Sequence, residues 1–159
     1  MMLDSSILLD GIKITALKQI NDSRGAVLHM IRNDSEEFTT FGECYFSEIF
    51  PNAIKAWKKH SKQTQNIVVP IGKIKLVLFD DRQGSTTLGK VMQLELFRPD
   101  SYSRITIPPQ IWYGFKCTGE TTALITNCVD IPHEPNESEI RDYLDTSIPY
   151  NWVSENIRK

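Results

Sequence analysis

The sequence predicts an all-β fold, a barrel or a sandwich, from two observations. Short apolar runs recur along the whole chain, and sequences typical of turns separate them. The period of a helix is visible only weakly, in one short segment near the end of the chain. With 159 residues, of which 40% are hydrophobic, the chain is long enough to bury one core. We therefore expect one domain that spans residues 1–159.

Ten segments are expected to be strands, because each is short, apolar and bounded by turn-forming sequences. Such turn sequences include NDSRG at 21–25 and DDRQGS at 80–85. The tight sequence Ile71-Gly72-Lys73 is expected to join two long strands directly. The expected strands are 11–17, 26–31, 45–50, 54–57, 65–71, 74–79, 91–97, 103–107, 114–117 and 121–128.

The last part of the chain differs from the rest. Residues 137–144 carry a weak helical period, and Asn136 is placed to cap a short helix there. The segment SIPYNW at 147–152 carries large aromatic residues. We expect this tail to pack back over the barrel or across a dimer partner. At or near the dimer interface we expect N-terminal strand residues, together with Tyr150 and Trp152.

Charge and composition exclude several classes of protein. The formal net charge is −2 and no block of basic residues occurs, so no nucleic-acid partner is expected. No apolar run reaches the ~18 residues that a membrane span needs, and no signal-peptide pattern opens the chain. We therefore expect no membrane association and a cytoplasmic location. The three cysteines show no CxxC or CxxH spacing, which is typical of reduced, mostly buried thiols.

The strand sequence IKAWKKH at 54–60 indicates a binding site. Alternate residues of a strand share a face, so Ile54, Ala56, Lys58 and His60 are predicted on one face. Lys55 is predicted on the other face, with Trp57. Ionisable groups that point into a small barrel are costly unless they bind or transform something. The sequence therefore predicts a barrel that holds a ligand.

Several motifs occur in an order that resembles one known family. They are NDSRG (21–25), YFSEIFP (45–51), IKAWKKH (54–60), VVPIGKIKLVLFDDR (68–82), IPPQIWYGF (107–115), a strand that ends in Asp130, and PHEPNESE (132–139). This order and spacing resemble the dTDP-4-dehydrorhamnose 3,5-epimerase family over roughly residues 8–152. That resemblance implies a cupin-type jelly-roll β-barrel.

The resemblance also implies an activity. Members of this family are homodimers that act on nucleotide-linked 4-keto-6-deoxy hexoses, without metal or organic cofactor, in deoxysugar or surface-polysaccharide biosynthesis. A 4-ketone acidifies the hydrogens on C3 and C5. A base removes one of them, an enolate forms, and an acid on the opposite face returns a proton.

The catalytic positions of the family are changed in this chain. Alignment puts Lys58 at the family's histidine base, His60 two residues later, and Asp130 at the aspartate that pairs with the base. The family's acidic tyrosine becomes Thr126, and a second family histidine becomes Tyr113. We predict that His60 is the base and that Lys58 binds the ketone oxygen or the enolate, with the reverse assignment as the alternative. Tyr113 is the candidate replacement for the acid.

Substrate-binding residues follow from the same resemblance. Arg24 matches the diphosphate-binding arginine, for which a bidentate guanidinium is well suited. Lys55 is expected to make a second phosphate contact. Further candidates that contact the nucleotide or line the sugar pocket are Gln65, Asn66, Tyr45 and Ser47.

A metal site is not expected. Metal-dependent cupins use a His-x-His sequence with a following carboxylate and a later histidine. The corresponding place in this chain reads Lys58-Lys59-His60, followed by Gln63 and Gln65, so the ligand set is missing.

Two alternatives to epimerisation stay open. A 3,4-ketoisomerase uses the same enolisation but moves the proton between carbons on one face, and loss of the family's tyrosine favours it. A nucleotide-sugar-binding cupin without catalysis is the second alternative, in which Lys58 only neutralises Asp130. Deuterium exchange from solvent into a 4-keto sugar distinguishes the three.

Overall fold

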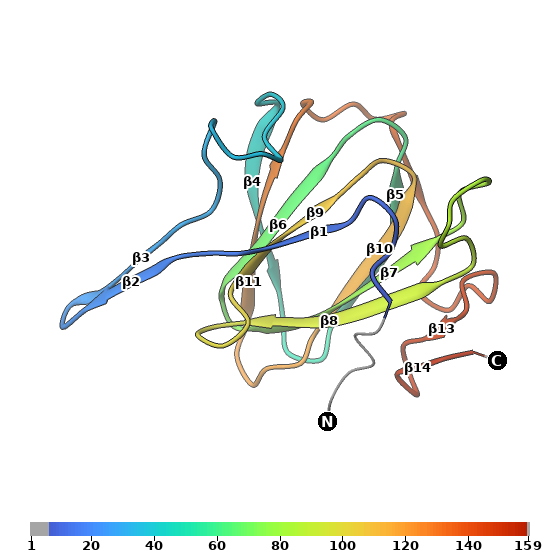
Figure 1. The fold of residues 1–159 in the computed structure, drawn as a ribbon. Helices are drawn as coiled ribbons and strands as arrows, with labels where there is room; N and C mark the ends of the chain where they lie inside the picture. The colour runs from blue at the N-terminus through green and yellow to red at the C-terminus, as the bar shows by residue number, and fades with distance from the viewer. Residues whose placement is uncertain (1–6, 159) are drawn as a thin grey trace.

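Two five-stranded antiparallel sheets face each other in the computed structural model, which describes residues 7–158 (Figure 1). The first sheet has the order β1 (Lys13–Ala16), β9 (Ser103–Ile107), β6 (Gln65–Ile71), β11 (Ala123–Val129), β4 (Glu43–Ile49). The second has the order β12 (Ser138–Ile140), β5 (Ile54–His60), β10 (Ile111–Cys117), β7 (Lys73–Asp80), β8 (Val91–Phe97). Neighbouring strands within each sheet are mostly distant in sequence, as in a jelly roll. The predicted jelly-roll fold is confirmed.

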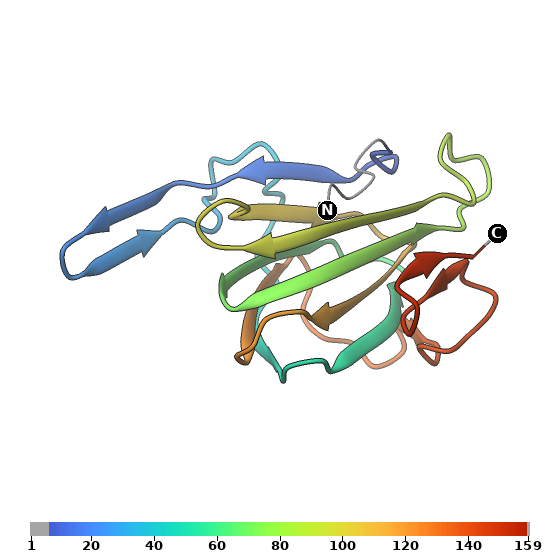
Figure 2. The same cartoon turned by 90° about the horizontal axis from the view of Figure 1, so that it is seen from below.

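Two short hairpins lie outside these sheets. β2 (Gln19–Asp22) and β3 (Gly25–Leu28) form an antiparallel arm that projects away from the barrel (Figures 1 and 2). β13 (Tyr150–Asn151) pairs with β14 (Asn156–Ile157) near the C-terminus. Each of the ten expected strand segments overlaps an observed strand, but β2, β12, β13 and β14 were not expected. The sequence of β2, QIND, carries a single apolar residue and so gives little signal.

The helix predicted at 137–144 is wrong, and no helix occurs within residues 7–158. The segment instead contains β12, which pairs with the edge of β5. Past the end of β12, the amides of Trp57 and Arg141 each donate to the other's carbonyl, at N···O distances of 2.8 and 3.0 Å. An open strand edge has unpaired amides and carbonyls. Hydrogen bonding of β12 to the edge of β5 therefore outweighs the weak helical preference of residues 137–144.

The core has two parts. The main cluster fills the space between the sheets, with side chains such as Leu76, Leu78 and Ile105 at 0% exposure. A second cluster lies on the outer side of β5, β7 and β10, where the C-terminal segment covers the sheet. There the rings of Trp57 and Trp152 lie 5.2 Å apart between centroids. The aromatic tail thus packs over the barrel of its own chain, which is one of the two arrangements predicted from the sequence.

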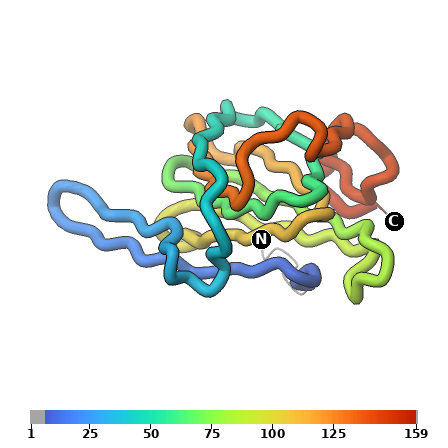
Figure 3. The backbone as a smooth tube through the Cα atoms, turned by 90° about the horizontal axis from the view of Figure 1, so that it is seen from above, coloured from blue at the N-terminus to red at the C-terminus, as the bar shows by residue number. Residues whose placement is uncertain are grey.

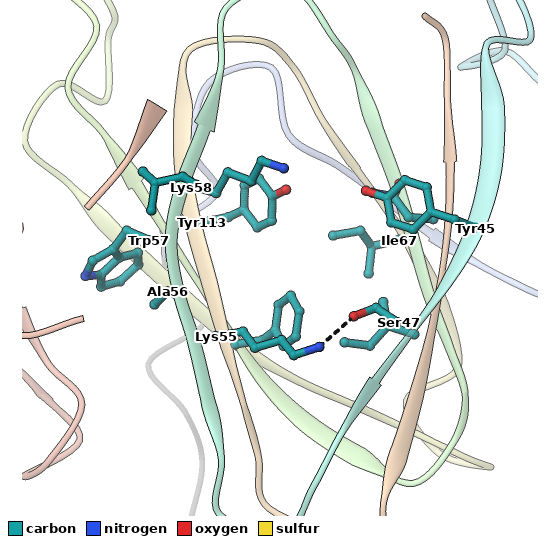
Figure 4. Close-up of a pocket in the computed structure, with 12 residues that line it drawn as sticks. Tyr45, Ser47, Lys55, Ala56, Trp57, Lys58, Ile67 and Tyr113 are labelled. Carbon is teal, nitrogen blue, oxygen red and sulfur yellow. Dashed lines mark hydrogen bonds between the residues drawn. The ribbon is translucent and has the colours of Figure 1, made fainter. Parts of the chain in front are cut away.

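A β-bulge in β5 decides which of its residues face the barrel interior. Lys58 is opposite Tyr113 on β10, but Lys55 is opposite Phe115, so β5 has one extra residue between the two pairs. Lys55 and Lys58 therefore share the interior face, and Trp57 joins Ala56 on the outer side (Figure 4). The strict alternation predicted from the sequence is wrong at this point, because one inserted residue shifts every later side chain to the other face.

A segment between β3 and β4 runs along the outside of the first sheet (Figure 3). Arg104 of β9, 2% exposed, donates to the carboxylate of Glu37 at 2.5 Å and to the carbonyl of Met30 at 2.9 Å.

Between residues 7 and 158 no helix has the length and apolarity that a membrane crossing requires.

Candidate active site

A cavity of about 300 Å³ lies between the two sheets, and strands of both sheets line it. Ile67, Phe115 and Ile125 give it an apolar inner surface, against which a sugar ring can lie. Polar groups enter from two opposite walls. The lining residues are Tyr45, Ser47, Lys55, Ala56, Trp57, Lys58, Ile67, Tyr113, Phe115, Ile125, Asn127 and Ile140.

The two walls carry different groups. Lys58 of β5 and Tyr113 of β10 enter from the second sheet, and Tyr45 of β4 enters from the first (Figure 4). The hydroxyl groups of Tyr113 and Tyr45 point toward each other across the cavity (Figure 4). Within residues 7–158 the Lys58 ammonium has no hydrogen-bond or ion-pair partner, so it is free to meet a ligand.

Tyr113 is the end of a buried hydrogen-bonded chain. Nε2 of His60 lies 3.1 Å from the Tyr113 hydroxyl, and Nδ1 of His60 lies 2.6 Å from a carboxylate oxygen of Glu137. His60 and Glu137 are 5% and 6% exposed. The other Glu137 oxygen accepts the backbone N–H groups of Lys62 and Gln63, each at 2.8 Å. His60 thus lies behind Tyr113, and the tyrosine hydroxyl is what reaches the cavity.

The charge states of this chain follow from its surroundings. Burial lowers the pKa of His60, against the opposing effect of Glu137, so the imidazole is neutral near pH 7. Burial acts to raise the pKa of Glu137, but the hydrogen bonds from His60 and the two backbone amides outweigh it and lower that pKa. Burial raises the pKa of Tyr113. An ionised Glu137 only accepts, so Nδ1 carries the proton and Nε2 accepts from the Tyr113 hydroxyl.

The carboxylate against His60 is that of Glu137, not that of Asp130. Asp130 accepts the backbone N–H of Thr64 at 2.8 Å, and within the described chain it makes no hydrogen bond to His60 or Lys58. The structure therefore corrects the expected pairing. No spacing in the sequence could have identified Glu137, because it lies 77 residues from His60 in a segment with a helical pattern.

Of the expected substrate-binding residues, Lys55, Ser47 and Tyr45 line the cavity. The Lys55 ammonium donates to the Ser47 hydroxyl at 3.0 Å and to the carbonyl of Glu48 at 2.5 Å (Figure 4). Tyr45 accepts a hydrogen bond from the side-chain amide of Asn127 at 2.9 Å. Asn127 also lines the cavity, although it was not predicted from the sequence.

Gln65, Asn66 and Thr126 lie outside the cavity lining. Gln65 is buried behind Asn127 and accepts from its side-chain amide. Asn66 accepts from the Thr106 hydroxyl at 2.8 Å. Thr126, which aligns with the family's acid, is between two residues of β11 that do line the cavity, and strand alternation directs it to the other face.

Arg24 lies far from the cavity of its own chain. It is at the tip of the β2–β3 arm, its side chain is 87% exposed, and its guanidinium pairs with Asp22 at 2.8 Å (Figure 1). Arg24 therefore does not line the cavity of its own chain. For metals, residues 7–158 hold no cluster of three or more His, Cys, Asp or Glu side chains that could bind one.

The family model of dTDP-4-dehydrorhamnose 3,5-epimerase matches residues 6–159. The chain belongs to this family. It is 48% identical to a dTDP sugar isomerase from Desulfovibrio desulfuricans G20, whose crystal structure matches with a TM-score of 0.91 over 95% of this chain and 98% of that one. The predicted family is thereby confirmed.

Two further relatives are named for the biosynthesis of a polysaccharide or a glycan. One is the spore coat polysaccharide biosynthesis protein SpsL of Bacillus subtilis (strain 168), 30% identical over 93% of this chain and 99% of the relative. The other is the probable low-salt glycan biosynthesis epimerase Agl13 of Haloferax volcanii, 34% identical over 84% and 83%. Both names agree with the expected role in polysaccharide or glycan biosynthesis, and the second also names the expected epimerase activity.

Proposed function

We propose that this member of the dTDP-4-dehydrorhamnose 3,5-epimerase family is an active epimerase of a nucleotide-linked 4-keto-6-deoxy hexose, and that it uses no cofactor. The observation that carries the proposal is the buried chain Glu137–His60–Tyr113, whose tyrosine hydroxyl enters a cavity beside the ammonium of Lys58. These are the two things that enolisation needs, a proton acceptor and a cation for the oxygen that becomes negative.

Tyr113 is the group that touches the substrate, and His60 acts through it. The C–H bond next to the ketone breaks, and its proton goes to the Tyr113 oxygen. The phenol proton passes at the same time to Nε2 of His60. The electron pair of the broken bond moves to the ketone oxygen and gives an enolate. The imidazolium that forms on His60 is stabilised by the ionised Glu137, 2.6 Å away.

Lys58 binds the enolate oxygen in this proposal. Lys58 is directly opposite Tyr113 on the neighbouring strand, and both side chains line the cavity. They can therefore reach the same part of a ligand. A cation placed where negative charge develops favours the transition state over the ground state. The alternative in which Lys58 only neutralises Asp130 is disfavoured, because no ion pair or hydrogen bond joins these two side chains among residues 7–158.

The protein acts as a homodimer in this proposal. The β2–β3 arm projects from the barrel and exposes Ile20 and Val27, which are 55% and 62% exposed and opposite each other on the two strands. Burying them against a second copy removes apolar surface from water. An arm that crosses to a partner also gives Arg24 at its tip a way to reach a diphosphate that Lys55 contacts from the partner's own cavity.

The test uses 4-keto-6-deoxyhexoses linked to thymidine, uridine, guanosine or cytidine diphosphate. Each is incubated with the protein in D2O with EDTA, and NMR locates deuterium and identifies products. We expect deuterium at C3, C5 or both, together with the inverted sugar. A 3-keto product identifies a ketoisomerase instead. If the protein exchanges no hydrogen in any of the four substrates, the proposed activity is wrong and a binding function is favoured.

A further inference from the structure

We propose that Tyr45 is the proton donor on the face of the substrate opposite Tyr113, so that the cavity inverts a carbon centre. The inference rests on the proposed epimerase activity and adds the second half of its mechanism. Inversion needs one group on each face of the planar enolate, because a single group returns the proton to the face from which it came. Tyr45 and Tyr113 lie on opposite walls with their hydroxyls directed toward each other (Figure 4).

The Tyr45 oxygen is held by a chain of oriented amides. Nδ2 of Asn127 donates to the Tyr45 oxygen at 2.9 Å and also to Gln65. Gln65 in turn donates to Gln63 at 2.7 Å, and Gln63 donates to the carbonyl of Ile131 at 2.6 Å. The side-chain amides of Gln65 and Gln63 direct their N–H groups away from Tyr45. The amide of Asn127 differs, because one of its N–H groups donates to the Tyr45 oxygen.

The orientation of the Asn127 amide is fixed at its other end. Its carbonyl oxygen accepts the backbone N–H of Asn66 at 3.1 Å, so the amide cannot turn over without losing that bond. The NH2 group of Asn127, a hydrogen-bond donor, is therefore what faces the Tyr45 oxygen. Because its oxygen accepts there, its own O–H has no acceptor in Asn127 and is free to point into the cavity.

This donor favours the product of proton transfer. When the Tyr45 O–H bond breaks, its proton goes to the enolate carbon and a phenolate stays behind. Burial raises the pKa of Tyr45, and the hydrogen bond from Asn127 lowers it in part, because an N–H donor stabilises the phenolate. Tyr45 is also 36% exposed, so water can return the proton after the product leaves.

The two halves of the mechanism are joined at one loop. The backbone N–H of Gln63 donates to Glu137, which supports His60 and Tyr113 on one wall. The Gln63 side chain begins the amide chain that ends at Tyr45 on the other wall. Residues 60–65 thus position both tyrosines. Tyr45 is on β4, directly opposite Asn127 on the paired strand β11, so the tyrosine and the amide that holds it enter the cavity from the same wall.

The test separates exchange from inversion. Tyr45→Phe removes only a hydroxyl, and it should lower the rate of inversion by at least ~100-fold, the usual worth of a positioned acid. Deuterium should still enter the recovered, uninverted substrate at the same carbon, because Tyr113 still removes and returns the proton on its own face. Tyr113→Phe should abolish both exchange and inversion. The matched control is Tyr143→Phe, since Tyr143 is 37% exposed and lies outside the cavity.

Two results would overturn the assignment while the proposed epimerase stands. One is inversion by Tyr45→Phe at the rate of the unchanged protein, which would mean that another group donates. The other is equal loss of exchange and inversion in that variant, which would place Tyr45 in the first step. If the unchanged protein exchanges no hydrogen with any of the four nucleotide sugars, it is the proposed function itself that fails. Circular dichroism of each variant confirms that it is folded.

Discussion

At the scale of single residues, the catalytic proposal depends on how His60 is placed. A histidine that faced the cavity could take the substrate proton itself, but His60 has a tyrosine hydroxyl on one nitrogen and a carboxylate on the other. It can accept the proton of Tyr113 only while its imidazole is neutral. Because burial lowers its pKa below the ordinary ~6.5, the neutral form persists into mildly acidic solution. We expect the acid limb of activity to lie below pH ~6.5.

Glu137→Gln tests this arrangement. Glu137 acts to raise the pKa of His60, so its replacement should lower that pKa further and move the acid limb of kcat/KM to lower pH. The maximal rate should fall as well, by ~10-fold or more, because the imidazolium loses its counter-ion. The pH profile of deuterium exchange measures both effects. Glu139→Gln is the control, since the Glu139 side chain is 63% exposed and should leave the profile unchanged. A limb that moves to higher pH would contradict the proposal.

The residues of the site differ in how far sequence could predict them. Lys58, Lys55, Tyr113, Tyr45 and Ser47 were placed in or at the site from strand position and family motifs, and all of them line the cavity. The partners behind them could not be found in this way. A buried hydrogen bond between residues far apart in the chain leaves no periodic signal, and Glu137 and Asn127 both act through such bonds.

At the scale of elements, the bulge in β5 is what brings two lysines to one wall. The outer side of this bulge is crowded. A Cβ atom added at Gly114 of β10 would lie 2.4 Å from Cβ of Ala56 and 3.0 Å from Cζ2 of Trp152. Real Cβ atoms do not approach another carbon so closely, and the nearer neighbour belongs to a strand paired with β10. Glycine at this position lets β5 and β10 pair while the C-terminal segment closes over them.

Gly114→Ala should therefore destabilise the protein. The added methyl group must push β5 away or displace Trp152, and overpacking of this kind costs ~1–3 kcal/mol. Thermal or urea unfolding measures the loss, which should appear as a lower Tm. The control is Gly119→Ala, because the nearest atom to its added Cβ is a side-chain carbon at 3.4 Å, an ordinary contact. Equal Tm values for the two variants would show that β5 adjusts at little cost.

Elements were predictable where local pattern and tertiary structure agree. Strands β6 to β9 were expected within two residues of their observed bounds, because apolar runs and turn residues mark both of their ends. The strand in segment 137–144 was not predicted. The local sequence carries a helical period, whereas the strand pairing depends on β5, which is distant in sequence. The inward direction of Lys55 was missed for a similar reason. A bulge is a property of two paired strands, and one strand's sequence does not reveal it.

At the scale of the whole molecule, the barrel covers most of its own surfaces but not its arm. The C-terminal segment covers the outside of the second sheet, and the segment before β4 runs over the first. The base of the β2–β3 arm is held by hydrogen bonds between Gln19 and the segment Arg98–Pro99, and the rest of the arm projects away from the barrel (Figures 1 and 2). A two-stranded hairpin is marginal in water by itself, so this arm needs a surface to rest on. A second copy of the chain is the partner that our proposal assigns to it.

The double variant Ile20→Asp, Val27→Asp tests that assignment. Two carboxylates in place of the paired apolar side chains should prevent burial of the arm and convert a dimer into a monomer. Light scattering at micromolar concentration measures the mass of both proteins. Val153→Asp is the control, because Val153 is 75% exposed but lies in the C-terminal segment. If Arg24 reaches the partner's cavity, the monomer should also bind the nucleotide sugar more weakly, as a raised KM. A monomeric mass for the unchanged protein would refute the dimer.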